Sequence, residues 1–414
     1  MQSTNSWLRI LRSLAAFVVM LLFVGRGIAG APRERVIYSF QGGTDGTNPS
    51  TALITDQAGN LFGTTTDGGS GSCTGGCGVV FELTPAPGGS WTETILYNFQ
   101  GGNDGAAPSA GLVFDRAGNL YGTTISGGPS FDGTVFRLTQ SGGSWTETVL
   151  HSFSGSDGAY PVDSLVFDDA GNLYGTTVFG GKFSGGTVFQ LAPSGDSWTE
   201  SVLYHFTGRN DGIDPEAALI LDAKGALYGT TIAGNVFKLT PPAAGDTKWS
   251  LKVIYTFGGG PNAGQLSEGT LLAGRNGALY GTQKFGGGPA NAGAVYQLTP
   301  PATHGGAWTE TTIYRFTGGA DGAYPYAGVI ADSAGNLYGT ASGNGRENHG
   351  TVFQLTPPAI HGTAWSETTL YAFSGRSDGS GPGANLVVGK GGALYSTTAG
   401  GGSAGKGTVF RIVH

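Results

Sequence analysis

The chain of 414 residues is short of charge, of sulfur and of helical patterning. Only 12% of its residues are charged, and it contains two Met and two Cys. No basic run occurs and acids outnumber bases, which argues against a nucleic-acid partner. Beyond residue 31 no stretch keeps apolar residues at the 3.6-residue spacing of a helix, while 78 residues are Gly. These shortages predict an all-β protein.

What is abundant is repetition. The phrase Gly-(Asn/Ala)-Leu-(Tyr/Phe)-(Gly/Ser)-Thr occurs seven times, starting at Gly59, Gly118, Gly171, Gly225, Gly277, Gly335 and Gly392. A fixed period of this length indicates one supersecondary unit copied and stacked, because a single copy cannot bury its own apolar face. The second copy contains four β-type runs, at 111–115, 119–124, 133–138 and 145–153, separated by turn residues. Four antiparallel strands per unit predict a propeller blade.

The two ends of the chain predict how the ring closes. The last copy has three strand-like runs, ending at 407–412, and no fourth. The missing run is found at 35–40, which matches the end of the fourth run in other copies. We therefore expect one domain, residues 32–414, folded as a seven-bladed β-propeller whose N-terminal strand completes the last blade. Closure of this kind hides sheet edges that would otherwise invite aggregation.

Residues 1–31 have the layout of a secretory signal peptide. Arg9 and Arg12 precede an apolar run at 14–24, and small residues follow, with cleavage expected after Ala29 or Ala31. The apolar run is too short to span a bilayer, so we expect no membrane span after its removal. Loss of three Arg and no acids would change the net charge from −7 to −10. The protein is expected to be exported, to the cell surface or the medium, with the periplasm as the alternative.

Cys73 and Cys77 are the only cysteines and lie in one loop. In an oxidising compartment their proximity favours a local disulfide. Zinc would need two more ligands, and no histidine spacing supplies them.

The repeated motifs resemble those of exported bacterial proteins with tandem GloVer (Gloeo-Verruco) repeats. The marks are Leu-Tyr-Gly-Thr-Thr-x-x-Gly-Gly, as at 120–128, and Gly-Thr-Val-Phe-x-Leu, as at 133–138. The resemblance implies an exported protein held at the cell surface, and no particular activity. This chain shows no sorting motif after its last strand, so we expect release or non-covalent retention. A looser similarity to kelch blades supports the architecture alone.

Three sets of residues recur from copy to copy and have structural as well as functional interpretations. The loop Asp-Gly-x-x-Pro displays one carboxylate per copy, and these are weak calcium candidates, although an Asp in a turn more often accepts backbone hydrogen bonds: Asp45, Asp104, Asp157, Asp211, Asp321 and Asp378. A second set is expected to cap the hairpin between the first two strands: Asp56, Asp115, Asp168, Asp222 and Asp332. The third set begins the fourth strands and is expected to fill the gaps between blades: Trp91, Trp145, Trp198, Trp249, Trp308 and Trp365.

A ligand site is better sought where the repeat is broken. In a propeller the loops from fourth to first strands and from second to third strands emerge on one face. Departures in the first group of loops are Tyr160, Asp163, Asp214, Glu216, Glu268, Tyr324 and Tyr326. Departures in the second group are Phe131, Lys182, Phe183, Lys284, Phe285, Arg346, Glu347 and His349. Aromatic residues mixed with a few charges suit a polar ligand such as a glycan, although free variation of surface loops would give the same pattern.

No catalytic motif, cofactor fingerprint or phosphate loop is present. The sequence therefore favours a secreted, non-catalytic, monomeric propeller without a cofactor that binds a polysaccharide or a cell-surface partner. One alternative is a glycan hydrolase or lyase whose acids come from separate blades, which would leave no local motif. The other is a purely structural or adhesive surface protein, for which we expect no pocket.

Overall fold

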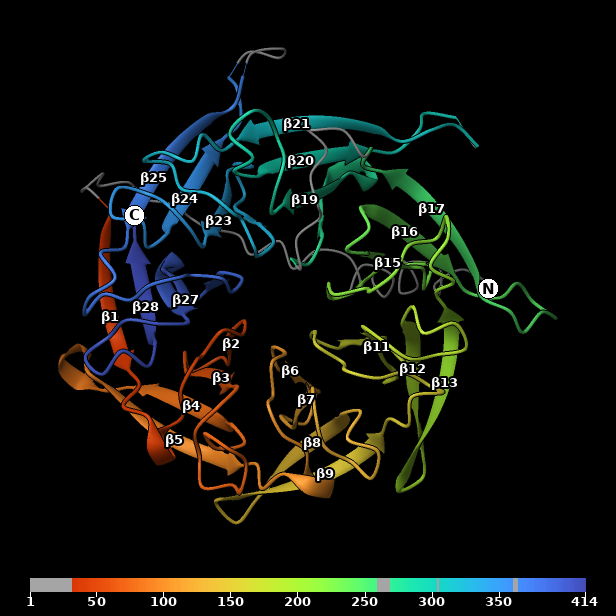
Figure 1. The fold of residues 1–414 in the computed structure, drawn as a ribbon, viewed down its shortest axis with the longest axis horizontal. Helices are drawn as coiled ribbons and strands as arrows, with labels where there is room; N and C mark the ends of the chain where they lie inside the picture. Colours follow the sequence, from red (N-terminus) through yellow and green to blue (C-terminus); the bar gives the residue numbers. More distant parts are fainter. Residues whose placement is uncertain (1–31, 259–268, 304, 360–363) are drawn as a thin grey trace, which may run out of the picture.

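The computed structural model describes residues 32–258, 269–303, 305–359 and 364–414. Seven four-stranded antiparallel sheets surround a central axis (Figure 1), so the predicted seven-bladed propeller is confirmed. The described residues contain no α-helix, and none of their helices is long and apolar enough to cross a bilayer. The predicted signal peptide lies outside the described residues.

Each blade runs from a two-residue strand at the axis to a long outer strand. The strands of the first four blades are β2 (Ile54–Thr55), β3 (Leu61–Thr65), β4 (Val79–Pro85) and β5 (Trp91–Asn98); β6 (Val113–Phe114), β7 (Leu120–Thr124), β8 (Thr134–Ser141) and β9 (Ser144–Ser152); β10 (Val166–Phe167), β11 (Leu173–Thr177), β12 (Thr187–Ser194) and β13 (Ser197–His205); and β14 (Ile220–Leu221), β15 (Leu227–Thr230), β16 (Asn235–Thr240) and β17 (Ser250–Thr256). The others are β18 (Leu272–Ala273), β19 (Leu279–Gln283), β20 (Ala294–Thr299) and β21 (Thr309–Arg315); β22 (Ile330–Ala331), β23 (Leu337–Ala341), β24 (Thr351–Thr356) and β25 (Ser366–Ala372); and β26 (Val387–Val388), β27 (Leu394–Thr398), β28 (Thr408–Val413) and β1 (Arg33–Ser39). The loops of the described ranges contain five 3-10 turns: η1 (Gly43–Asp45), η2 (Pro87–Gly89), η3 (Gly102–Asp104), η4 (Arg275–Gly277) and η5 (Lys390–Gly392).

The N-terminal strand closes the ring as predicted. β1 pairs antiparallel with β28, with Arg33 opposite Val413 and Ser39 opposite Thr408. In Figure 1 the red strand β1 therefore lies along the blue strand β28 at the outside of the last blade. Hydroxyl groups complete closure near the axis. A threonine in the second strand donates to a loop carbonyl of the next blade in several interfaces, and Thr397 does so to Thr51 across the junction of last and first blades.

The first strand of each blade is shorter than predicted. The run at 111–115 forms only the pair Val113–Phe114 of β6. Crowding at the axis explains the difference, because a Cβ on Gly111 would lie 2.6 Å from the Ser164 hydroxyl oxygen of the next blade and 3.2 Å from Ala52 of the previous one. Residues there pack against neighbouring blades and leave the ladder early.

Aromatic pairs hold neighbouring blades together. The residue that follows an outer strand packs edge-on or tilted against the third strand of the next blade at all seven junctions, with ring centroids 4.7 to 5.3 Å apart: Phe40–Phe81, Phe99–Phe136, Phe153–Phe189, Phe206–Phe237, Phe257–Tyr296, Phe316–Phe353 and Phe373–Phe410. Such pairs contribute about 0.5–1.5 kcal/mol each beyond area burial. The tryptophans that begin the outer strands also pack between blades, as Trp198 does against Tyr121 of the preceding blade. Their predicted structural role is confirmed.

Candidate functional site

A cavity of about 550 Å³ lies on the propeller axis. Every blade contributes to its wall through the loop that precedes its first strand, and Ile125, Ser342 and Ala399 add loops from second to third strands. The cavity therefore opens on the face where these two groups of loops emerge. Its volume falls within the roughly 300–1,000 Å³ usual for small-molecule sites.

The proline of the Asp-Gly-x-x-Pro loops decides which side chains reach the cavity. In six loops the residue directly after this proline lines the wall: Ser50, Ser109, Val162, Glu216, Tyr326 and Gly383. The residue directly before it has a positive φ in all six and is absent from the wall: Asn48, Ala107, Tyr160, Asp214, Tyr324 and Gly381. A left-handed residue redirects the chain, so neighbours two positions apart face different surroundings.

Three of the predicted site residues line this cavity. They are Asp163, Glu216 and Tyr326, contributed by the third, fourth and sixth blades. Lys284 lies beside one of them, with its Nζ 3.9 Å from the centre of the Tyr326 ring. The Asp163 carboxylate accepts a hydrogen bond of 2.8 Å from the backbone N–H of Ser164. The wall thus combines carboxylates, hydroxyls and an aromatic ring.

The other predicted residues that the structure describes do not line the cavity. Phe285 packs against Tyr324, with ring centroids 5.3 Å apart. Arg346 and Glu347 are exposed in the loop between β23 and β24. Glu268 lies outside the described residues.

A strip of exposed apolar side chains lies on the same face over the second, third and fourth blades. It consists of Phe131, Tyr160, Phe179, Phe183, Ile213 and Ile232, with Phe131 the most exposed at 64%. Tyr160 and Phe179 contact each other edge-on at 5.8 Å, and the backbone of Tyr160 bonds to that of Asp132, next to Phe131. Phe179 and the two isoleucines were not predicted, although they occupy the same two groups of loops. We call these six residues the exposed apolar strip.

Phe131 itself is held in an unfavourable backbone conformation. Its φ is 61°, and the corresponding loop positions are occupied by Ser184, Asn291, Asn348 and Gly405. Bulky residues rarely adopt this conformation, whereas Asn and Gly do so readily. The loop therefore displays an exposed Phe at a conformational cost.

Comparison with known proteins identifies the repeat. The family model of the Gloeobacter/Verrucomicrobia repeat matches residues 70–288 and 267–414, which together make up most of the chain. The protein belongs to the Gloeobacter/Verrucomicrobia repeat family. No curated protein matches the sequence significantly.

Two solved structures are similar to this Gloeobacter/Verrucomicrobia repeat protein at low identity, and the likeness to the first extends to its fold. A "putative 6-phosphogluconolactonase" from Bacteroides uniformis is 15% identical, with a TM-score of 0.51 over 82% of this chain and 89% of that one. A protein of unknown function from Dyadobacter fermentans is 12% identical, with a TM-score of 0.44 over 82% and 98% of the two chains. At such identities the likeness extends to the fold alone.

The repeat's loop aspartates are engaged in hydrogen bonds within their own turns. Asp211 accepts bonds from the Tyr204 hydroxyl at 2.9 Å, the Thr207 backbone at 2.8 Å and the Thr207 hydroxyl at 2.6 Å. Burial by itself would raise the pKa of Asp211, but the hydrogen bonds from Thr207 and Tyr204 outweigh it and lower the pKa. The other five calcium candidates accept equivalent bonds, which supports the structural interpretation of this motif.

The hairpin aspartates also act as predicted. Asp115 accepts bonds from the backbone of Ala117 and Asn119 and from the Tyr121 hydroxyl. Cys73 and Cys77 are joined by a disulfide with their Cα atoms 5.1 Å apart.

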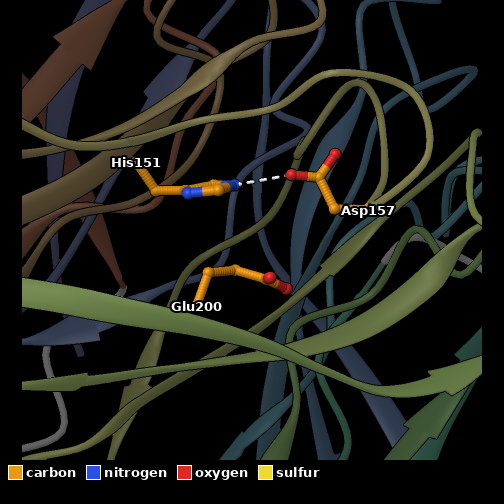
Figure 2. A group of neighbouring side chains, drawn as sticks. All are labelled: His151, Asp157 and Glu200. Atoms are coloured by element: carbon orange, nitrogen blue, oxygen red, sulfur yellow. Dashed lines mark hydrogen bonds and ion pairs between the residues drawn. The ribbon is translucent and has the colours of Figure 1, made fainter.

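Carboxyl pairs between blades of the repeat were not predicted. A glutamate on an outer strand lies beside the loop aspartate contributed by the preceding blade in five junctions: Asp45/Glu93, Asp104/Glu147, Asp157/Glu200, Asp321/Glu367 and Asp378/Glu34. Burial, and then repulsion by Asp45, raises the pKa of Glu93 to about 8. Burial, and then repulsion by Asp157, raises the pKa of Glu200 to about 7. At the other four junctions a tyrosine hydroxyl donates a hydrogen bond to the aspartate. Beside Asp157 and Glu200 the tyrosine is replaced by His151 (Figure 2). For four of these five glutamates the available sequence signal was the recurring Trp-x-Glu phrase, which Glu34 lacks.

Proposed function

We propose that this protein is an exported, non-catalytic receptor for a polysaccharide. The polysaccharide would lie across the exposed apolar strip, with one sugar unit or one chain end in the axial cavity. The observation that carries the proposal is the convergence of Asp163, Glu216 and Tyr326 in one cavity on the face that bears the strip. A purely structural role predicts a face without a pocket, so the cavity counts against that alternative.

The chemistry of this face suits a sugar better than an apolar or anionic ligand. Aromatic rings supply contact area for the apolar faces of sugar rings, and carboxylates and side-chain hydroxyls accept and donate hydrogen bonds to sugar hydroxyls. Asp163 and Glu216 also place negative charge in the cavity wall. A neutral or cationic glycan therefore fits better than a sulfated or uronic one.

A second candidate function rests on the same two carboxylates. Glycosidases use a pair of acids on either side of the scissile bond, and Asp163 and Glu216 come from neighbouring blades to one cavity. A glycan hydrolase or lyase would use them as general acid and as base or nucleophile. The binding proposal differs from this one in requiring no turnover.

A glycan array with the secreted protein, followed by calorimetry on the best ligand, tests the proposal. We expect Phe183→Ala and Tyr326→Ala each to weaken binding by about tenfold, as losing an aromatic contact costs roughly 1–2 kcal/mol. Val413→Ala, at an exposed apolar residue on the last strand, is the matched control and should bind normally.

Product analysis on the same ligands separates the two candidates. Release of shorter sugars by the wild type, abolished by Asp163→Asn and by Glu216→Gln with binding retained, would replace the receptor proposal with the enzyme. Absence of binding to every glycan would overturn both. Export is tested independently by N-terminal sequencing of the secreted chain, where a start at Gly30 or Pro32 is expected.

A further inference from the structure

One junction between blades differs from the others in a way that changes its chemistry. At equivalent positions of the outer strands, paired with a valine of the third strand, six blades carry tyrosine: Tyr38, Tyr97, Tyr204, Tyr255, Tyr314 and Tyr371. The second blade carries His151 there, paired with Val135. The replacement puts an imidazole nitrogen where the other junctions have a phenol oxygen.

The histidine faces two carboxyl groups. His151 lies on β9, Asp157 lies in the loop that follows, and Glu200 lies on β13 of the next blade (Figure 2). One potential ligand atom from each of the three residues lies within 4.8 Å of the other two, and Nε2 of His151 lies 2.9 Å from Oδ2 of Asp157. The three residues thus present one nitrogen and two oxygens toward a common point.

The glutamate in this group lacks a partner for one of its buried oxygens. Oε1 of Glu200 has no hydrogen-bond partner among the described residues. Among the described residues, Oδ2 of Asp157 has His151 as its hydrogen-bond partner, while Ser154 donates to Oδ1 from its backbone N–H at 2.9 Å and from its hydroxyl at 3.0 Å. Within the described ranges, no lysine or arginine forms an ion pair with Asp157 or Glu200. The half-buried carboxyl groups of Asp157 and Glu200 therefore share a site in which no lysine or arginine side chain neutralises their charge.

We propose that His151, Asp157 and Glu200 bind one divalent transition-metal ion, for which Zn²⁺ is the best match. Zinc accepts imidazole nitrogen and carboxylate oxygen together as ligands, whereas calcium takes oxygen ligands. Tetrahedral ligands at about 2.1 Å from zinc stand roughly 3.4 Å apart. His151 and Asp157 would separate by about half an ångström and the Glu200 side chain would close the remaining gap, leaving a fourth position for water.

The other junctions of the same ring explain why the site is confined to this one. Where tyrosine replaces histidine, the hydroxyl donates to the aspartate, as Tyr97 does to Asp104 at 2.5 Å, and burial raises the tyrosine pKa, so the phenol stays neutral and is a weak ligand. At the next junction, Leu251 occupies the glutamate position opposite Leu239. Tyrosine at the histidine position and leucine at the glutamate position therefore both occur in intact blades of this ring, so either ligand can be replaced without disturbing the fold.

Calorimetric titration of the untagged full chain with ZnCl₂, with metal analysis after dialysis, tests the proposal. We expect one Zn²⁺ per chain and a rise in melting temperature that CaCl₂ does not reproduce. His151→Tyr and Glu200→Leu install residues found at equivalent positions of this ring, so both variants should fold. Each should weaken Zn²⁺ binding at least about tenfold, since even the loss of residues behind a metal ligand costs 10–100-fold.

His205→Asn is the matched control, because His205 lies on β13 outside the cluster, where Nδ1 accepts a hydrogen bond from the Lys182 backbone. It should leave affinity and stoichiometry unchanged. Co²⁺ should give visible absorption bands that disappear in His151→Tyr. Unchanged Zn²⁺ affinity in both His151→Tyr and Glu200→Leu, or no stoichiometric Zn²⁺ in the wild type, would overturn the proposal.

Discussion

The hydroxyl of Thr397 donates a hydrogen bond of 3.3 Å to the carbonyl oxygen of Thr51, and so joins the last blade to the first beside the axis. The same bond, from Thr123 to Pro161 at 3.1 Å, joins two blades that are consecutive in sequence. The junction that closes the ring is thus built like one in the middle of the chain, although its two halves lie at opposite ends of the sequence.

Replacing Thr397 with valine should measure the strength of this closure. The side chains of Thr397 and Thr123 are both buried. Thr397→Val leaves the carbonyl of Thr51 without its hydrogen bond, at a cost of about 1–2 kcal/mol. Thr123→Val is the matched control and should cost the same if the two junctions are equally tight. Urea unfolding of both variants provides the measurement. A much smaller loss for Thr397→Val would mean that the ring opens at this junction before it unfolds.

Replacing Phe131 with glycine should separate stability from binding. Glycine removes the penalty of the left-handed conformation and sacrifices little burial, because Phe131 is mostly exposed. We expect stability to stay the same or to rise by up to about 1 kcal/mol, net of glycine's own entropic cost. Binding of the glycan ligand should weaken. Ser184→Gly, at the equivalent position, should leave binding nearly unchanged, and a loss of stability in Phe131→Gly would show that the ring packs on the protein.

Stability should fall as the pH rises from about 4.5 to 8, because several carboxyls have raised pKa values in the folded state. The pKa of Glu93 is raised to about 8 by burial and by Asp45, so the folded state holds a proton that the unfolded state has released over this range. Glu93→Gln should flatten this slope and be more stable than wild type at pH 8, by on the order of 1 kcal/mol after allowance for solvent screening. Thermal melts at several pH values measure it. Glu347→Gln, in an exposed loop, should keep the wild-type slope, and an unchanged slope in Glu93→Gln would contradict the assignment.

The disulfide should stabilise only modestly, because it closes a very short loop. Loop-entropy estimates give about 2 kcal/mol for a ring of this size. Cys73→Ser keeps the buried Cys77 in place and should lower stability by that amount or less without altering the propeller. Denaturation with and without a reductant checks the value, since reductant should affect the wild type and leave the variant unchanged.

The fold could be predicted from the sequence because the segment that forms each blade contains the local signals for its own strands and turns. Turn residues and alternating apolar positions are local, and the displaced fourth strand at 35–40 is visible by comparison with six intact copies. Strand length at the axis was overestimated, since the close approach of Gly111 to Ser164 is set by neighbouring blades. That crowding is a property of the ring, and no single copy reveals it.

The candidate site could be predicted only in part, because the backbone conformation of the proline loops decides which side chains reach the cavity. Among the residues that break the repeat, Glu216 lines the cavity, whereas Asp214, two positions earlier, is turned away by a left-handed backbone. The carboxyl pairs were missed because their members come from different blades. Glu200 on its own strand resembles any polar residue on a solvated sheet face.

The pairing of Arg33 with Val413 places the two ends of the described chain side by side. A short linker between them would make the polypeptide circular, and new ends could then be cut in any exposed hairpin, such as the one at Pro87–Gly89. Circularly permuted genes that start in such a hairpin are therefore expected to encode the same ring.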